Sequence, residues 1–78
     1  MSDPQLTPRM RQVAELVADG LSYTQIGERL GLKPQTAEAH AQGVRTLLGL
    51  HTRAELAAWV IARRAQAAGD AAAERRAE

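Results

Sequence analysis

Polar side chains gather in residues 33–45 at spacings that suit recognition of nucleic-acid bases. Gln35, Thr36 and Gln42 fall outside the apolar positions of this stretch, and a Gln amide is a natural bidentate partner of adenine through N6 and N7. Glu38 lies between them and could accept a hydrogen bond from a cytosine N4 amino group. The same residue types also suit an ordinary solvated helix face, so their chemistry depends on the elements that carry them.

Other polar residues could meet phosphate. His40 follows Thr36 by four residues, on the same side of a helix, and its protonated ring nitrogen could donate to a phosphate oxygen; packing beside the preceding helix is the alternative. Tyr23 and Thr24 stand in the first turn of an expected helix, where backbone amides and the positive end of the dipole can hold an anion. For Tyr23, simple surface exposure explains the position equally well.

No constellation for catalysis or metal binding accompanies these residues. The 78-residue sequence has no Cys and only two His, and the one carboxylate at helical ligand spacing from His51 is Glu55, which is better explained as a helix cap. No nucleophile, base and oxyanion-stabilising group can be seen to converge. We therefore expect no enzyme activity, no metal site and no cofactor.

Length and charge narrow the class of protein further. A chain this short buries only about 60% of its unfolded surface, so its stability margin is thin and dimerisation would help. Its net charge of +1 is small for a DNA-binding domain, which usually carries a clear basic excess. No apolar run approaches a membrane span, and the N-terminal MSDPQ lacks the features of a signal peptide. Cytoplasmic residence is expected.

Capping and turn residues predict an all-α fold of four helices. Thr7 and Pro8 open a first helix at about 8–19. Ser22 and Gln25 form a reciprocal capping box for a second helix at about 23–30, after which Gly31 suits a left-handed helix end. The third helix is expected at about 34–48, where the inward positions are Ala37, Ala41, Val44 and Leu48.

A fourth helix begins after a second capping box, formed by Thr52 and Glu55. Leu56, Trp59 and Val60 define its apolar stripe. Trp59 is large enough to serve either the core or an interface, and smooth apolar residues on the neighbouring faces suit pairing with a second copy of this helix. The residues expected in that dimer interface are Trp59, Ala58, Ile61 and Ala62.

The second and third helices, with the Gly-centred turn between them, have the layout of a helix-turn-helix. The ordered motifs LTPR, VADGLS, IGERLGL, TAEAH, LLGL and TRAEL resemble those of the LuxR-type helix-turn-helix family, which also includes small free-standing regulators. This resemblance implies a compact four-helix bundle without a wing, whose third helix enters the major groove and whose fourth often pairs two copies. It covers the domain (6–64) and leaves an N-terminal extension (1–5) and an Ala- and charge-rich tail (65–78). Because the tail has no large apolar residue, we expect a frayed helix or a solvated terminus rather than a contact arm.

The resemblance also implies which residues meet DNA, and the chemistry of the side chains adds Gln35 and Tyr23 to them. Base contacts are expected from Gln35, Glu38, Ala39 and Gln42. Phosphate contacts are expected from Tyr23, Thr24, Lys33, Thr36, His40 and Arg45. The chain departs from the family pattern in Glu38, where Lys is common, and in Lys33, where a Ser or Thr cap is usual. Met10 and Ala14 replace a Glu and a larger aliphatic residue in the first helix.

Two functions of different classes follow. The first is a transcriptional regulator that binds duplex DNA, with a homodimer formed through the fourth helix. The second is a protein-interaction module that keeps the fold and binds another regulator or RNA polymerase, as the weak basicity and Glu38 suggest. A resemblance to the promoter-reading region of sigma factors is a weaker variant, because the fourth helix continues in the LuxR manner.

Overall fold

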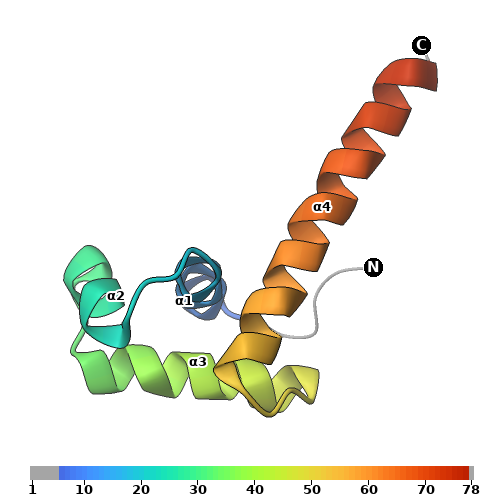
Figure 1. Cartoon of the computed structure of the whole chain (residues 1–78). Helices are drawn as coiled ribbons and strands as arrows, with labels where there is room; N and C mark the ends of the chain where they lie inside the picture. Colours follow the sequence, from blue (N-terminus) through green and yellow to red (C-terminus); the bar gives the residue numbers. More distant parts are fainter. Residues whose placement is uncertain (1–5, 78) are drawn as a thin grey trace.

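The structure is a computed structural model that describes the backbone of residues 6–77 and the side chains of residues 6–70. Four helices follow one another: α1 (Pro8–Ala18), α2 (Tyr23–Leu30), α3 (Pro34–Leu48) and α4 (Arg53–Ala77). α1 packs against each of the other three helices, and α4 rises away from the body of the domain (Figure 1). The prediction of an all-α, four-helix fold is confirmed, and residues 6–77 contain no strand.

Side-chain caps start three of the four helices as the sequence predicts. Thr7 Oγ1 accepts the Met10 amide at 3.1 Å, with no return bond because Met10 has no carboxylate. At α2, Ser22 Oγ accepts the Gln25 amide at 3.1 Å while Gln25 Oε1 accepts the Ser22 amide at 2.9 Å. These bonds satisfy first-turn amides that have no partner inside the helix, so the helix starts are defined by local sequence.

The start of α4 carries a capping box with an additional bond. Glu55 donates its amide to Thr52 Oγ1 at 3.0 Å, and Glu55 Oε1 accepts both the Thr52 amide at 2.9 Å and the His51 amide at 2.7 Å. These two backbone donors hold the pKa of the Glu55 carboxyl below its ordinary value, because they favour the charged form. Glu55 is therefore a cap, as the sequence predicts.

The start of α3 differs from the others, because Lys33 provides no side-chain cap. Pro34 instead begins the helix with φ already near the helical value and with no amide to satisfy. The helices on either side of the turn end at Gly31 and Gly49, which have φ of 71° and 70°. Non-glycine residues rarely adopt this left-handed conformation, so both helix ends are set by glycine.

One aliphatic core holds the four helices together. Its largest fully buried side chains come from a different helix each: Val13 from α1, Ile26 from α2, Val44 from α3 and Leu56 from α4, all 0% exposed. Burial of such a side chain contributes roughly 1.5–3 kcal/mol relative to exposure. No polar or charged residue is buried among the side chains of residues 6–70, so this core is entirely apolar.

Gly27 fixes how the chain passes from α2 to α3. The Leu32 amide donates to the Gly27 carbonyl at 2.8 Å, and a Cβ built on Gly27 would lie only 2.3 Å from the Leu32 carbonyl oxygen. That neighbour is backbone and cannot rotate away. Only glycine therefore permits this approach, which sets the angle at which α3 leaves the turn.

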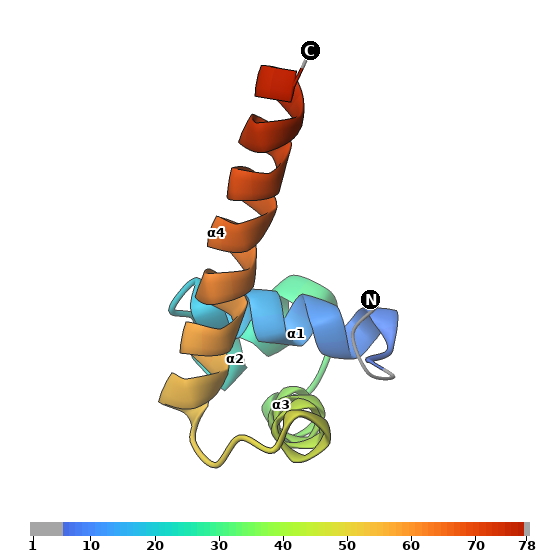
Figure 2. The same ribbon diagram turned by 90° about the vertical axis from the view of Figure 1, so that its right-hand side faces the viewer.

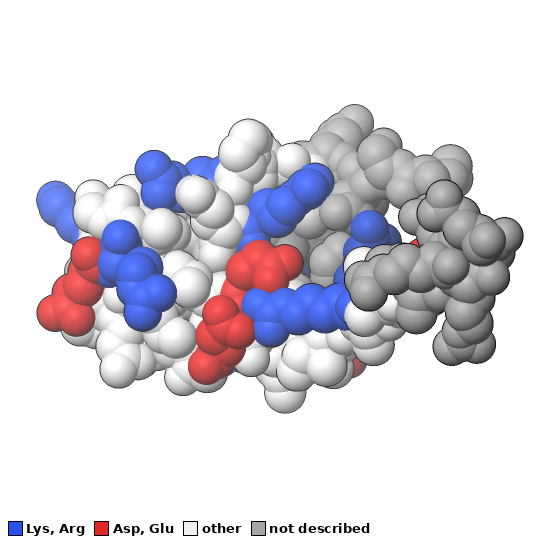
Figure 3. All heavy atoms as spheres, turned by 90° about the horizontal axis from the view of Figure 1, so that it is seen from above, with Lys and Arg blue, Asp and Glu red and all other residues white. Residues whose placement is uncertain are grey.

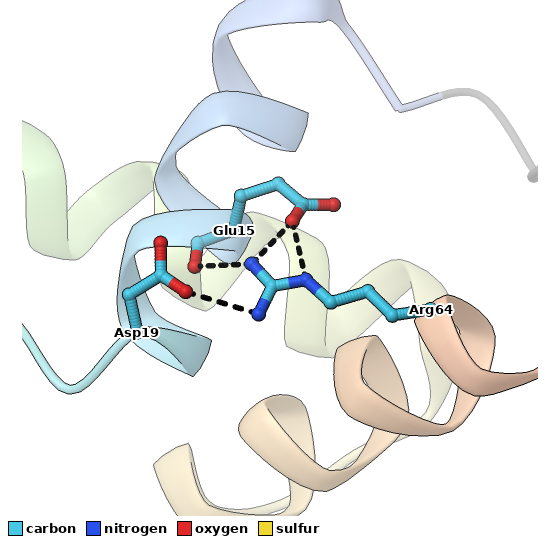
Figure 4. Close-up of polar contacts among 3 residues, drawn as sticks. All are labelled: Glu15, Asp19 and Arg64. Carbon is cyan, nitrogen blue, oxygen red and sulfur yellow. Dashed lines mark hydrogen bonds and ion pairs between the residues drawn. The ribbon is translucent and has the colours of Figure 1, made fainter. Parts of the chain in front are cut away.

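Arg64 fastens α4 to the C-terminal half of α1 (Figure 4). Its Nε and Nη2 reach Glu15 Oε1 at 2.9 and 2.5 Å, its Nη2 also donates to the Glu15 carbonyl at 3.1 Å, and its Nη1 lies 3.0 Å from Asp19 Oδ1. These acceptors raise the pKa of the Arg64 guanidinium. Acidic and basic side chains alternate on the face of the molecule that Figure 3 shows.

The segment expected as a tail is helical, because α4 continues without interruption to Ala77. The side chains of 61–70 are exposed, which agrees with a solvated segment, and Figure 2 shows α4 extending well beyond the other helices. Ala is the strongest helix former, so Ala-rich sequence sustains the helix after its last core residue, Val60. None of the helices in residues 6–77 has both the length and the apolar character needed to cross a bilayer.

Replacement of Gly27 with Ala tests the close approach at the turn. We expect the free energy of unfolding to fall by about 1–3 kcal/mol, because overpacking against backbone outweighs the better helix propensity of Ala. Urea denaturation followed by circular dichroism measures it. Gly69→Ala is the matched control, since a Cβ there meets nothing within 4 Å. Equal stability of Gly27→Ala and the parent would refute the constraint.

The Glu55 cap predicts a pH dependence of stability. Because its folded pKa is lowered, the cap stabilises the fold fully above the unfolded pKa, about 4.3, and this contribution is lost as pH falls through the folded pKa. Glu55→Gln should therefore be less stable than the parent at neutral pH, with a difference that shrinks in acid. Thermal unfolding of both proteins over this range checks the sign, and a difference independent of pH would contradict it.

Candidate nucleic-acid interface

The four residues expected to meet bases share one exposed face of α3. Gln35, Glu38, Ala39 and Gln42 occupy positions i, i+3, i+4 and i+7, and all four are exposed. The opposite face holds the buried Ala37, Ala41 and Val44. α3 runs along an edge of the body, with α1 and α2 on one side of it (Figure 1). The polar face is thus directed away from the domain.

The Glu38 carboxylate is available for an external donor. It is exposed and forms no hydrogen bond or ion pair with another residue in the described part of the chain. The next Arg or Lys along α3 is Arg45, seven positions later. A free carboxylate on this face repels phosphate but can accept from an amino group of a base.

The expected phosphate-binding residues of α3 lie on both flanks of this face. At 3.6 residues per turn, Thr36 and His40 project to one side of it and Arg45 to the other. Thr36 and Lys33 are exposed, whereas His40 and Arg45 are half-buried. Arg45 Nε is buried with no hydrogen-bond partner among the described residues. The half-buried position of His40 is compatible with either of the two roles left open by the sequence.

Simple surface exposure, one of the two interpretations that the sequence allows for Tyr23, does not describe its position in the first turn of α2. Thr24 is exposed, but Tyr23 is half-buried and packs on the core. The Arg53 guanidinium covers its ring, with 4.7 Å between the guanidinium carbon and the ring centroid. Arg53 Nη2 also donates to the Leu21 carbonyl. Sequence reasoning missed Arg53, because thirty positions separate it from Tyr23 and neither residue type demands the other.

The exposed face of α4 contains three of the four residues expected in a dimer interface. Ala58, Ile61 and Ala62 are exposed, and Ile61 keeps 52% of its surface accessible. Trp59 points about a quarter turn away from them, is half-buried against the core, and carries the Arg63 guanidinium 5.0 Å from its ring centroid. Trp59 therefore packs partly within its own domain.

The described residues offer no alternative metal chemistry at this surface. No group of three His, Asp or Glu side chains is placed to hold an ion within residues 6–70. The polar face of α3 and its flanks instead combine the Glu38 carboxylate with amide, hydroxyl, imidazole, ammonium and guanidinium groups, which are side chains used to contact bases and phosphates.

Comparison with known proteins agrees with this geometry. The family described as "Bacterial regulatory proteins, luxR family" matches residues 4–60. The transcriptional regulatory protein UhpA of Escherichia coli is 44% identical over 55 residues, which are 70% of this chain and 28% of UhpA. The transcriptional regulatory protein MctR of Rhizobium johnstonii is also 44% identical over 55 residues, covering 70% of this chain and 25% of MctR.

A third relative is the nitrate/nitrite response regulator protein NarL of Escherichia coli, 38% identical over 56 residues, or 72% of this chain and 26% of NarL. The chain thus spans about a quarter of the length of these relatives. The matched residues include all of α1, α2 and α3 and the first part of α4. The chain belongs to the luxR family of bacterial regulatory proteins and carries its helix-turn-helix domain.

Proposed function

We propose that this chain is a non-enzymatic transcriptional regulator of the cytoplasm that binds duplex DNA by placing α3 in the major groove. The observation that carries the proposal is the exposed polar face of α3, Gln35 to Gln42, opposite a fully buried stripe. A helix presented in this way fits the width of the major groove. Membership of a family of bacterial regulators favours this function over a module that binds only protein.

Base recognition rests on the four residues of the exposed face. Gln35 and Gln42 pair with adenine through N6 and N7, Glu38 accepts from cytosine N4, and Ala39 makes apolar contact with a thymine methyl group. Each good bidentate pair discriminates against the wrong base by about 1–3 kcal/mol. Because Glu38 repels phosphate, its place on this face contributes selectivity rather than affinity.

Phosphate contacts position the helix on the duplex. Thr36 and His40 meet one strand and Arg45 the other, since they project on opposite flanks of α3. Lys33 and the first turn of α2 with Tyr23 and Thr24 add contacts at the entrance of the groove. Few of these groups are cations, so affinity falls with salt less steeply than in strongly basic domains.

We also propose that two copies pair through the exposed α4 face of Ala58, Ile61 and Ala62, with Trp59 at its border. Ile61 is a large aliphatic residue left 52% exposed in a domain that buries its other aliphatic residues on this helix, Leu56 and Val60. Pairing across a two-fold axis would place the two α3 helices about 34 Å apart, one turn of duplex. The operator is then a palindrome.

The direct test selects duplexes from a random pool at low salt with the parent chain and with Glu38→Lys. The parent should enrich a palindromic site. Glu38→Lys should lose selection at the cytosine position while binding random duplex more tightly, and the slope of log affinity against log salt should steepen by about 0.9 for each phosphate gained.

Glu28→Lys is the matched control, because it makes the same charge change at an exposed position of α2. It should leave the enriched sequence unchanged. If the parent enriches no sequence and binds duplex no better than a neutral protein, the proposal of DNA binding is wrong. If Glu38→Lys enriches the parent's site, Glu38 reads no base.

The dimer is tested with Ile61→Asp. A charge placed on a buried apolar interface is not tolerated, so we expect the dissociation constant of the dimer to rise at least about tenfold, as measured by sedimentation equilibrium. Leu47→Asp makes the same change at the other large exposed aliphatic residue, which is 42% exposed on α3, and should leave dimerisation unchanged. Equal dimer affinity for Ile61→Asp and the parent would exclude this face.

A further inference from the structure

Arg53 links α4 to the first turn of α2 through its guanidinium. It is the first residue of α4, and throughout their lengths the Cα atoms of α2 and α4 stay more than 8 Å apart. The long Arg53 side chain spans this distance and adds a second connection to the core that Ile26 of α2 and Leu56 of α4 share.

Both contacts of the guanidinium flank the N-cap of α2. Nη2 donates to the carbonyl of Leu21, the residue before the Ser22 cap. The guanidinium plane also lies over the ring of Tyr23, the residue after the cap. A planar, delocalised guanidinium can stack on an aromatic face and donate from its edge at the same time, whereas a Lys ammonium cannot.

The first turn of α2 contains backbone amides that are free to donate hydrogen bonds. Ser22 Oγ accepts the Gln25 amide, but the amides of Tyr23 and Thr24 donate to no group among the described residues. Free amides in the first turn of a helix are the donors that bind phosphate oxygens. Arg53 contacts Leu21 and Tyr23, the residues on either side of the cap and next to these amides.

We infer that Arg53 is a positioning residue for DNA binding: it holds the first turn of α2 so that the Tyr23 and Thr24 amides face a backbone phosphate. The inference rests on the proposed function. Under this inference α4 has two functions: it pairs two copies, and through Arg53 it positions the first turn of α2.

The test compares the full chain with Arg53→Lys and Arg53→Gln on the duplex that the parent selects. If Arg53 positions these amides, both variants should lose affinity about tenfold, the effect of one misplaced contact. The slope of log affinity against log salt should stay the same, because neutral backbone amides release no counterions from the phosphates. In the free proteins, the amide resonances of Tyr23 and Thr24 should shift while those of Glu38 to Gln42 do not.

Arg63→Lys is the matched control, because Arg63 also stacks on an aromatic ring of the same helix but lies away from α2. It should bind DNA as the parent does. If Arg53→Lys does not fold, as judged by circular dichroism, Tyr23→Leu is used instead; it removes the aromatic face, leaves the bond to Leu21, and should reproduce a smaller loss of affinity.

Three outcomes would overturn the inference. If Arg53→Lys retains the parent's affinity while Arg53→Gln loses it and the salt slope falls by about 0.9, Arg53 contacts a phosphate directly. If the parent binds its site and both variants bind equally well, Arg53 has no part in binding although the proposed function stands. If the parent itself selects no duplex, the proposed function fails and this inference fails with it.

Discussion

Every helix of this domain depends on one apolar core to which each contributes a single large, fully buried side chain. Val13, Ile26, Val44 and Leu56 meet there, and the sequence has no Cys with which to form a disulfide. Loss of one of these side chains would therefore loosen all four helices at once. The polar face of α3 can be presented at the edge of the molecule only because Val44, on its opposite face, is held in this core.

Side-chain polar contacts add to the packing of the core, and most of those between helices attach α4. Arg53 ties its first residue to α2, and Arg64 ties a point three turns later to Glu15 and Asp19 of α1. Exposed ion pairs such as the Arg64 cluster add little to stability in water. Their effect is geometric, because they attach α4 at two further points, while the burial of Leu56 and Val60 leaves Ile61 on the outward face.

The exposed polar face of α3 has an unusual balance of charge for a helix proposed to bind DNA. It combines two amides with the unpaired carboxylate of Glu38, while Lys33 and Arg45 stand at its borders. A carboxylate on this face lowers the affinity for DNA, because phosphates repel it. It raises selectivity among bases, because it can accept a hydrogen bond from a donor on the correct base. The weak net charge of +1 therefore fits the regulator proposed above, in which base contacts and the proposed pairing of two copies take the place of nonspecific attraction.

The sequence by itself determined the helix starts, the glycine ends of α2 and α3 and the core, because caps, glycine ends and apolar spacing act over four or five residues. It did not determine the end of α4, which continues to Ala77. The Ser22–Gln25 box, the Gly31 end and the stripe of Ala37, Ala41 and Val44 are all local, and all are found as predicted. The roles of Arg53 and Arg64 were decided only by the tertiary structure. Their partners lie 32 and 49 positions away, and a charged side chain finds such partners only after the apolar core has brought the helices together.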